Sequence, residues 1–283
     1  MPEPAAIGID VGGTKIAVGG VFGDGRLEHR TQIGTADATL DKLAAVAGRA
    51  AEQLDSHATV TGVGVGICEL VDDAGQIRSA TSVAWTAAEL EAALGGLGPV
   101  AVEADVRAAA LAEARFGAGR PFGSFLYLTI GTGISHCLVE DGEPYRGAHG
   151  CAQLSGSAAL SFRCPHCGEP VRLSVEDVAS GAALGRAEQA AAAVADAAAA
   201  LGPFLALLVN VLDPEAVVVG GGLGSADGAY WRALVRAARE HVWADHVREL
   251  PIVQAGLGAD SGVIGAGLTG LRAAEGESTT RKG

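Results

Sequence analysis

The feature that most constrains this chain is the stretch from Ile7 to Val21, IGIDVGGTKIAVGGV. Apolar residues alternate with small or polar ones on both sides of a Gly-Gly-Thr turn, which predicts two β-strands joined as a hairpin. A turn built on Gly12 and Gly13 lets backbone N–H groups approach an oxyanion, because no Cβ stands in the way. The same residues also suit an ordinary hairpin in which Asp10 caps the turn.

Side chains around this turn favour a phosphate-binding interpretation. Asp10 lies at the end of the first predicted strand, where its carboxylate can hold a hydrated divalent cation. Thr14 adds a hydroxyl and Lys15 a positive point charge. The pattern GxxxxGK[ST] is absent and no helical pattern follows the glycines, so the turn is not a P-loop. The stretch therefore predicts a hairpin phosphate loop.

Length and charge narrow the class of protein. A chain of 283 residues is long enough for two domains of ordinary size. The net charge of −13 speaks against a nucleic-acid partner, because binding a phosphate backbone needs a basic face. No run of 18 uncharged apolar residues is found, the alanine-rich run 190–201 is short, and residues 1–6 lack a basic start. We therefore predict a cytoplasmic protein without a membrane segment.

Strand and helix patterns alternate after the first hairpin, which predicts an α/β architecture. The predicted strands are 27–33, 60–67 and 100–102, and the predicted helices are 41–54, 86–94 and 106–116. Asp105 stands between the last of these strands and the last of these helices. A carboxylate at such a junction is a candidate catalytic residue, but taken alone the junction favours a helix N-cap.

The second half of the chain repeats the opening pattern about 120 residues later, which indicates an internal duplication. A predicted strand at 124–130 leads into the turn Gly131-Thr132-Gly133 and a returning strand at 134–139. Two such turns can bind a polyphosphate together. Further on, the glycine triplet 220–222 follows a buried strand, and it would let a flat ligand lie close to the backbone.

The cysteines leave two alternatives open. Cys164-Pro-His-Cys167 has the spacing of half a zinc site, the knuckle that presents two thiolates to one metal. His149 and Cys151 lie upstream, but nothing in the sequence brings them to the knuckle. Structural zinc and a metal-free loop are therefore both compatible with the sequence, and an odd total of five cysteines does not indicate a disulfide framework.

Five segments, taken in order, resemble the ROK family of sugar kinases (repressor, open reading frame, kinase), a branch of the actin–hexokinase superfamily. They are DVGGTK at 10–15, Asp105 with AAALAE at 108–113, LTIGTGI at 128–134, VVVGGGL at 217–223 and DSGVIGA at 260–266. The resemblance implies a two-domain actin–hexokinase (ribonuclease H-like) α/β fold with a cleft between the domains. It places the smaller domain at 1–106 plus about 266–283 and the larger one at 107–265, and it implies a homodimer.

The resemblance also implies roles for individual residues. Asp105 matches the catalytic aspartate, and Mg²⁺ would bind near Asp10. The ATP phosphates would be bound by the two turns, that is by Asp10, Gly12, Gly13, Thr14, Lys15, Gly131, Thr132 and Gly133. The adenosine would lie against Gly220, Gly221 and Gly222.

The departures from the family cluster at the acceptor site. Ala104 stands where the family usually has Asn, Leu154 where it has the sugar-binding glutamate, and Ser157 where it has a histidine that is also a zinc ligand. A third cysteine after Cys167 is missing, and only Glu176 keeps its place among the acceptor contacts. Losing one charged hydrogen bond to a hydroxyl costs about 1.5–3 kcal/mol. We therefore expect a modified hexose, an amino sugar or a cyclitol as the acceptor rather than plain glucose.

The function predicted from these residues is ATP-dependent phosphorylation of a sugar-like hydroxyl. Asp105 would accept the proton of the attacking hydroxyl as a general base. One alternative is a non-catalytic nucleotide- or sugar-binding protein, a pseudokinase or sensor, on the same fold. Another is an ATPase without an acceptor.

Overall fold

The computed structural model describes residues 2–54, 58–185 and 191–276 of the chain. These residues form two compact units. The first contains residues up to 120, then 142–152, and then those from 260 onward, whereas the second contains 121–141 and 153–259. The predicted domain limits, 1–106 with about 266–283 and 107–265, stay a prediction, and their residues 277–283 lie outside the described part.

The first unit is built on a five-stranded sheet of order β3-β2-β1-β4-β5. Its strands are β1 (Glu3–Val11), β2 (Lys15–Phe22), β3 (Leu27–Gly34), β4 (Ala58–Ile67) and β5 (Val100–Ala104). β1 and β2 form the predicted antiparallel hairpin, with Val11 opposite Ile16 next to the turn. β1, β4 and β5 run parallel to one another. Their carboxyl ends therefore meet at one edge of the sheet.

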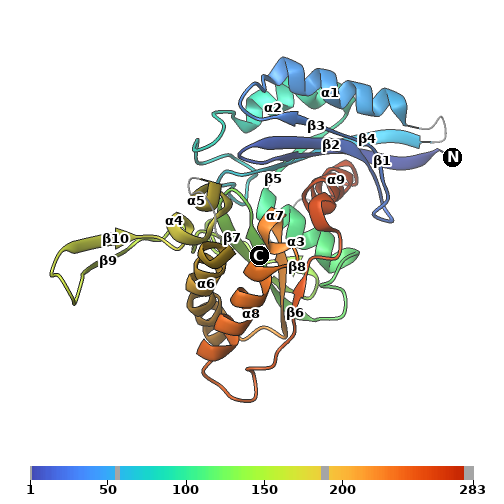
Figure 1. Ribbon diagram of the computed structural model, residues 1–283. Coiled ribbons are helices and arrows are strands. Elements are labelled where there is room, and N and C mark those ends of the chain that lie inside the picture. Colours follow the sequence, from blue (N-terminus) through green and yellow to red (C-terminus); the bar gives the residue numbers. More distant parts are fainter. Residues whose placement is uncertain (1, 55–57, 186–190, 277–283) are drawn as a thin grey trace. The chain divides into compact units, whose positions relative to one another are not determined.

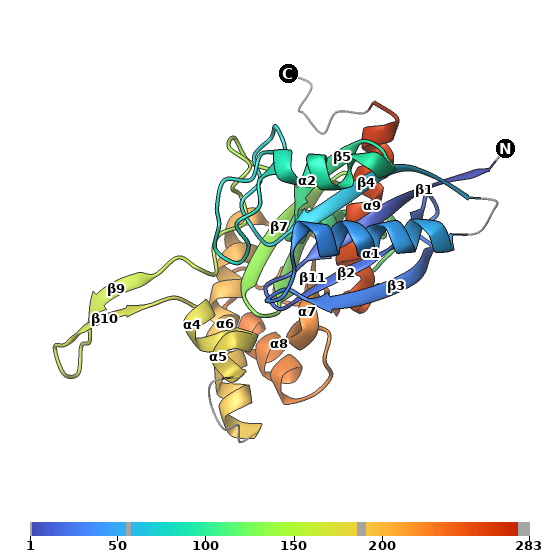
Figure 2. The same cartoon turned by 90° about the horizontal axis from the view of Figure 1, so that it is seen from above.

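Helices cover both faces of this sheet (Figures 1 and 2). The helices of the unit are α1 (Leu40–Gln53), α2 (Ala87–Leu94), η1 (Gly95–Leu97), α3 (Asp105–Arg115) and α9 (Ser261–Ala274). α1 and α2 lie on one face and α9 on the other. α2 starts with a capping box, in which Thr86 and Glu89 satisfy each other's backbone N–H groups. A short strand, β8 (Glu143–Pro144), lies in the segment 142–152.

α9 lies unusually close to the sheet because glycines face it. A Cβ at Gly64 of β4 would lie 1.7 Å from the carbonyl oxygen of Ala266, and one at Gly8 of β1 would lie 2.2 Å from that of Val263. Neither position has room for a methyl group, so helix and sheet pack backbone against backbone. The Ser261 hydroxyl at the start of α9 also donates to the buried Glu113 carboxylate of α3, at 2.7 Å.

In the second unit, β12 (Ile252–Gln254), β11 (Ala216–Gly220), β6 (Ser124–Ile130) and β7 (Ile134–Glu140) lie side by side in that order. β6 and β7 form the second predicted hairpin, and β11 runs parallel to β6. The helices of the unit are α4 (Glu176–Ala179), α5 (Gly181–Gly185), α6 (Ala191–Leu212), α7 (Gly221–Gly224) and α8 (Ala229–His241). η2 (Gly258–Asp260) leads from this unit into α9.

α6 is a long apolar helix. By length and composition its stretch Ala192–Leu212 could cross a membrane, although no such segment was expected. The apolar run continues past residue 201, and the helix holds Asp196 without being interrupted by it. Core helices of globular proteins pass the same test. Here one face of α6, including Leu201 and Leu205, is fully buried in the core with residues of β6, β11 and α8.

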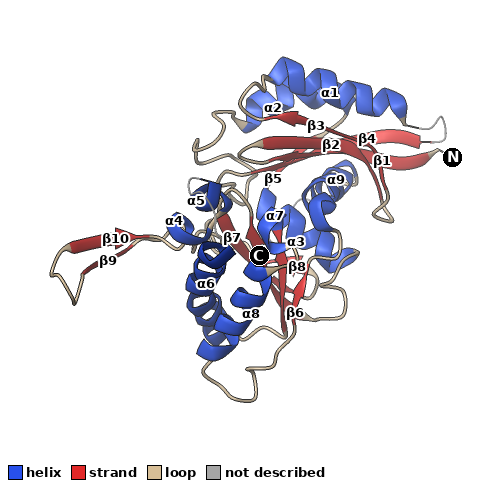
Figure 3. Cartoon of the chain, viewed as in Figure 1, coloured by secondary structure: helices blue, strands red, loops and turns tan. Residues whose placement is uncertain are grey.

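A further hairpin, which the sequence analysis did not predict, lies within residues 150–180. β9 (Leu160–Arg163) and β10 (Pro170–Leu173) pair antiparallel and project from the rest of the second unit (Figure 3). The Cys164–Cys167 segment forms the loop between these strands. The short helix α7 at the glycine triplet was also not predicted, because glycine disfavours helices.

Candidate active site

Two aspartates meet at the carboxyl edge of the first unit's sheet. Asp10 is the second-last residue of β1, and Asp105 directly follows β5. Because these strands flank β4 and run parallel to it, both carboxylates lie at the same edge of the sheet. The negative charge of Asp10 contributes to the raised pKa of Asp105, which places the two groups within electrostatic reach of each other.

Both carboxyl groups hold protons more tightly than in water. Burial raises the pKa of Asp10 to about 6, against the opposing charges of Lys15 and Arg30. Burial, and then the charge of Asp10, raises the pKa of Asp105 to about 7, while the Val106 N–H and the Arg107 charge oppose this shift. A carboxylate with a pKa near the working pH is well matched to act as a general base.

The geometry of Asp105 does not match that of a helix N-cap. α3 begins at Asp105 itself, and the residue at the capping position, Ala104, provides no side-chain hydrogen bond. The Asp105 Oδ1 instead accepts the N–H of its immediate neighbour Val106, at 2.7 Å. An N-cap side chain accepts from the second or third residue of its helix. The methyl group of Ala104 is itself fully buried in the core.

The phosphate turn of the first unit is held in place by the segment after β3. The Gly12 N–H donates to the Lys15 carbonyl at 3.0 Å and closes the turn. The Thr35 hydroxyl donates to the Gly12 carbonyl at 2.7 Å, and the Thr35 N–H donates to the Thr14 carbonyl at 3.1 Å. Gly13, Thr14 and Lys15 are exposed. The predicted loop residues are thus assembled beside Asp10 and are open to solvent.

Glu69 organises a second loop at the same edge, and the sequence did not point to it. Its carboxylate is 3% exposed and follows β4. One carboxylate oxygen accepts hydrogen bonds from the Ser79 hydroxyl and, at 2.9 Å, from the Thr81 N–H. The other oxygen accepts the N–H of Ser82 at 2.5 Å and the N–H of Val83 at 3.1 Å. A single buried carboxylate therefore fixes the whole 79–83 segment. A glutamate after an apolar strand gave no signal of this role, since three of its four donors are backbone N–H groups.

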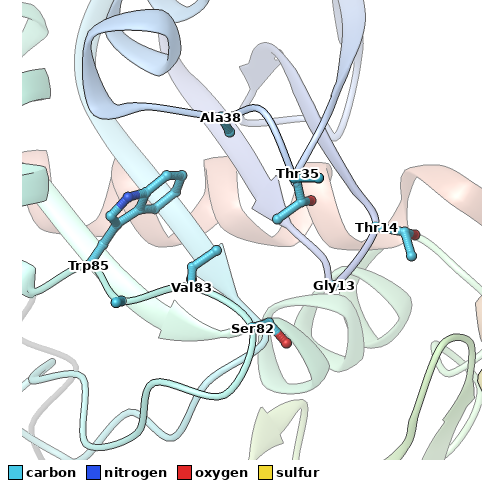
Figure 4. A pocket seen from close by; sticks show the side chains of 9 residues that line it. Gly13, Thr14, Thr35, Ala38, Ser82, Val83 and Trp85 are labelled. Atoms are coloured by element: carbon cyan, nitrogen blue, oxygen red, sulfur yellow. The ribbon is translucent and has the colours of Figure 1, made fainter.

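This loop and the phosphate turn enclose a pocket of about 560 Å³ (Figure 4). Side chains that line it include Thr14, Thr35, Ala38, Ser82, Val83 and Trp85. The pocket lies entirely within the first unit.

A buried ion network supports the chain next to Asp105. Arg107 is 1% exposed, and its Nε donates to the Glu103 carboxylate at 2.6 Å. Its terminal nitrogens donate to the carbonyls of Gly150 and Val71 at 2.7 and 2.6 Å. Arg146 donates to the other oxygen of Glu103. The network ties β5, α3, the loop after β4 and the segment 142–152 together.

In the second unit, two predicted acceptor residues lie beside the second phosphate turn. The Glu176 Oε1 accepts the N–H of Ile134, which directly follows Gly131-Thr132-Gly133, at 3.1 Å. The Ser157 hydroxyl donates to the Glu176 Oε2 at 2.7 Å. The N–H of Gly181 donates to the Gly131 carbonyl at 2.7 Å. The structure thus brings Ser157, Glu176 and the second turn together.

A histidine missed by the sequence reasoning supports the same segment. The Nδ1 of His136 on β7 lies 2.5 Å from the Ser155 hydroxyl oxygen, and burial lowers the pKa of His136. Leu154 is 45% exposed. The family resemblance places a sugar-binding carboxylate at this position.

The glycine triplet has structural reasons of its own. A Cβ at Gly220 would lie 2.2 Å from the Tyr127 hydroxyl, and one at Gly221, where φ is +81°, would lie 2.5 Å from the Ile130 carbonyl. Gly222, in contrast, faces open space. Close packing therefore accounts for two of the three glycines, and only Gly222 is free of that constraint.

The cysteine knuckle does not provide a full set of metal ligands. Cys164 and Cys167 share one loop, in which backbone N–H groups of Cys167 and His166 lower the pKa of Cys164. Within residues 2–54, 58–185 and 191–276, no group of three or more His, Cys, Asp or Glu side chains is arranged to hold a metal ion. His149 and Cys151 belong to the first unit. A structural zinc site needs four ligands, so the described residues do not fit one.

The chain belongs to the ROK family, whose family model matches residues 6–194 and 185–270. It is 31% identical to the bifunctional enzyme NanE/NanK of Brucella melitensis, over 93% of this chain and 53% of that enzyme. It therefore spans about half the length of that relative. It is 29% identical to the N-acetylgalactosamine kinase AgaK of a Shewanella species, over 93% of this chain and 96% of the relative.

The fold agrees with this assignment. A solved structure of a ROK family glucokinase from Streptomyces griseus, in complex with glucose and AMPPNP, superposes with a TM-score of 0.81 at 26% identity. The match covers 95% of this chain and 99% of that one. The two-sheet α/β architecture is therefore that of the ROK sugar kinases of the actin–hexokinase fold, as the sequence predicted.

Proposed function

We propose that this chain is an ATP-dependent phosphotransferase that phosphorylates a hydroxyl of a sugar-like acceptor, with Asp105 as the general base. The observation that carries the proposal is the pair of Asp10 and Asp105 at one sheet edge, with the pKa of Asp105 raised to about 7. A carboxylate that only capped a helix would not need burial next to a second carboxylate. Membership of the ROK family and the named kinase relatives support the same reaction.

In the proposed reaction, Asp105 takes the proton of the acceptor hydroxyl as that oxygen attacks the γ-phosphorus of ATP. The exposed N–H groups of the first turn and the Lys15 ammonium stabilise charge on the phosphate oxygens. The second turn, Gly131 to Gly133, and Gly222 are assigned to the rest of the nucleotide. Asp10 provides the hard oxygen ligand that suits Mg²⁺, which neutralises phosphate charge when bound.

The acceptor in this proposal is a modified hexose, an amino sugar or a cyclitol. Leu154 cannot accept hydrogen bonds from hydroxyls, and Ser157 binds Glu176 instead of reaching outward. An acceptor with fewer hydroxyls at those positions loses less binding free energy than glucose would. The named activity of the AgaK relative, on N-acetylgalactosamine, supports the amino sugar option.

A non-catalytic binding protein is the second candidate. The observation that favours it is Glu176, whose two oxygens are both engaged within the second unit, by the Ile134 N–H and the Ser157 hydroxyl. A sensor could keep this arrangement, whereas a kinase acceptor has to compete with Ser157 for the carboxylate. Transfer activity separates the two candidates.

We also propose a cytoplasmic homodimer. Leu207 and Val211 on α6 are 55% and 70% exposed, and Trp243, which is 88% exposed, is tied to the same helix through the Asn210 amide. Exposed apolar side chains of this size favour contact with a second copy of the chain. Light scattering on the purified protein would test this. Zinc is left out of the proposal because the described donor set is incomplete.

The deciding experiment measures phosphate transfer from Mg-ATP with a panel of hexoses, amino sugars, N-acyl amino sugars and cyclitols, and measures ADP release without an acceptor. We expect acceptor-dependent ADP release with at least one panel member. Binding of a non-hydrolysable ATP analogue without any transfer would favour the non-catalytic candidate. Equal ADP release with and without acceptors would indicate an ATPase.

A further inference from the structure

The carboxylate of Asp10 lies against the backbone at the start of α9. A Cβ at Gly262, the second residue of that helix, would lie 2.4 Å from the Asp10 Oδ2, 2.6 Å from its Cγ and 2.9 Å from its Oδ1. Nonbonded heavy atoms attract one another best at separations of about 3.5–4 Å. The carboxylate therefore occupies the space that any side chain at position 262 would need.

The backbone gives no reason for glycine at this position. The φ angle of Gly262 is not positive, and the residue lies inside a helix, where glycine is less favourable than alanine. The three atoms nearest to a Cβ at position 262 all belong to the Asp10 carboxylate. Contact with that carboxylate, rather than local conformation, explains the missing side chain.

The start of α9 is fixed and cannot retreat from this contact. The Ser261 hydroxyl donates to the buried Glu113 carboxylate at 2.7 Å, and the Asp260 carboxylate pairs with the Arg30 Nε at 2.6 Å. The ion pair is partly exposed and adds little, because solvent screens it. The buried hydrogen bond and the backbone contacts of α9 with β1 and β4 hold the helix in place.

The Asp10 side chain, in contrast, is free to turn. Among the residues that the structure describes, none donates a hydrogen bond to either Asp10 oxygen, and Lys15 and Arg30 act on the carboxylate through their charges. Both oxygens are thus available to a hard cation such as Mg²⁺, which prefers carboxylate ligands. A methyl group at position 262 would displace this carboxylate by about 1 Å, because ordinary contact needs about 3.5 Å.

We propose that Gly262 positions the Asp10 carboxylate for Mg-ATP: the missing side chain lets the carboxylate lie against α9, and the fixed start of the helix sets where its oxygens stand. Gly262 is a positioning residue, since it acts through Asp10. The proposal rests on the proposed phosphotransferase function for the role of Asp10. A displacement of about 1 Å matters because Mg²⁺ demands near-ideal octahedral geometry, and such an error can cost about 10²-fold.

Calorimetric binding of a non-hydrolysable ATP analogue, with Mg²⁺ and with EDTA, tests the proposal without any transfer. Mg²⁺ should strengthen binding to the unaltered protein by about tenfold or more, a difference that calorimetry resolves. Gly262→Ala should reduce this ratio to that of Asp10→Ala and leave the affinity in EDTA unchanged. Gly267→Ala is the matched control in the same helix, because its Cβ would lie 2.3 Å from the Val21 Cβ and does not face Asp10. It should lower the melting temperature but keep the ratio.

Melting curves of the combined variant give a second readout that needs no ligand. In the Asp10→Ala background the three atoms that a methyl group at position 262 meets are gone. The change in melting temperature caused by Gly262→Ala should therefore be clearly more favourable there than beside an intact Asp10. If Gly262→Ala alone does not fold, the double variant decides: a folded double variant supports the contact, and an unfolded one overturns it.

Several results would overturn the proposal. Gly262→Ala could keep the Mg²⁺ ratio, or Gly267→Ala could lose it to the same extent. The methyl group at position 262 could change the melting temperature equally with and without the Asp10 carboxylate. Mg²⁺ could also fail to strengthen binding of the analogue to the unaltered protein.

The transfer assay separates this proposal from the proposed function. A Mg²⁺ ratio that is lost in Gly262→Ala, without transfer to any acceptor by the unaltered protein, would leave the positioning role standing and refute the kinase. Transfer by the unaltered protein, together with an unchanged Mg²⁺ ratio in Gly262→Ala, would leave the kinase standing and refute the positioning role.

Discussion

Replacing Asp105 with asparagine removes the proposed base but keeps the shape of the side chain. The amide oxygen of the introduced asparagine can still accept the Val106 N–H that Asp105 accepts at 2.7 Å. A general base contributes about 10²- to 10⁴-fold to the rate, so Asp105→Asn should slow transfer by that factor. In the unaltered protein, kcat should rise as the pH increases through about 7, because only the ionised carboxylate accepts a proton.

Asp105→Asn should also raise the free energy of unfolding at pH 8. The pKa of Asp105 lies at about 7 in the folded protein and near 3.8 in an unfolded chain. The folded state therefore holds a proton that the unfolded state has lost, and stability falls as the pH rises from about 4 to about 7. At about 1.4 kcal/mol per pKa unit the loss has an upper limit of about 4 kcal/mol. Solvent reaches this partly buried group and screens its charge, so we expect Asp105→Asn to gain about 1–3 kcal/mol at pH 8.

Urea unfolding at pH 4 and pH 8, with transfer rates at pH 6 to 9, measures both effects. The two proteins should have similar stabilities at pH 4, and Asp105→Asn should be the more stable one at pH 8. A variant that is less stable at pH 8 but retains its activity would refute the assignment, because Asp105 would then be a structural residue. Asp105→Ala provides the control in which both the carboxylate and the Val106 hydrogen bond are lost.

Three further substitutions test other parts of the site. Arg107→Met breaks a buried pair with Glu103, so urea unfolding should show a loss of about 3–5 kcal/mol; a loss below about 1 kcal/mol would mean that Arg146 alone satisfies Glu103. Leu154→Glu restores a hydrogen-bond acceptor, and transfer to a plain hexose should increase, whereas no increase in a folded variant would argue against this residue facing the acceptor. Cys164→Ser should leave the metal content unchanged in elemental analysis, and loss of one zinc equivalent would show that further ligands complete the knuckle.

The fold could be predicted largely because its strands and turns follow local rules. The hairpin at the first phosphate turn is present as expected, since alternating apolar residues and a Gly-Gly turn specify both strands and their register. The β9–β10 hairpin escaped prediction because its strands are short and mostly exposed, so their sequence lacks a buried face.

Sequence reasoning singled out candidate site residues only where they belong to a short local motif. Asp10, Asp105 and the two glycine turns were singled out because a carboxylate or a glycine turn follows a predicted strand, and their roles stay a prediction. Glu69 and His136 were not, because each acts through partners that are distant in sequence: Glu69 binds N–H groups more than ten residues away, and His136 lies beside Ser155. Such contacts leave no local pattern. The glycine triplet shows the reverse error, since packing against Tyr127 and Ile130 explains two of its members.

The position of α9 has a consequence for the order of events during synthesis. The sheet edge that holds Asp10 and Asp105 is complete within the first 105 residues, but the helix that packs on that sheet spans Ser261–Ala274. The glycine face of β1 and β4 must therefore wait, uncovered, while the ribosome makes the whole second unit, at about 5–20 residues per second. The second unit can mature on the nascent chain, whereas the first cannot. At that rate the residues between β5 and α9 take about 8–30 seconds to synthesise, so the glycine-lined face stays uncovered for at least that long.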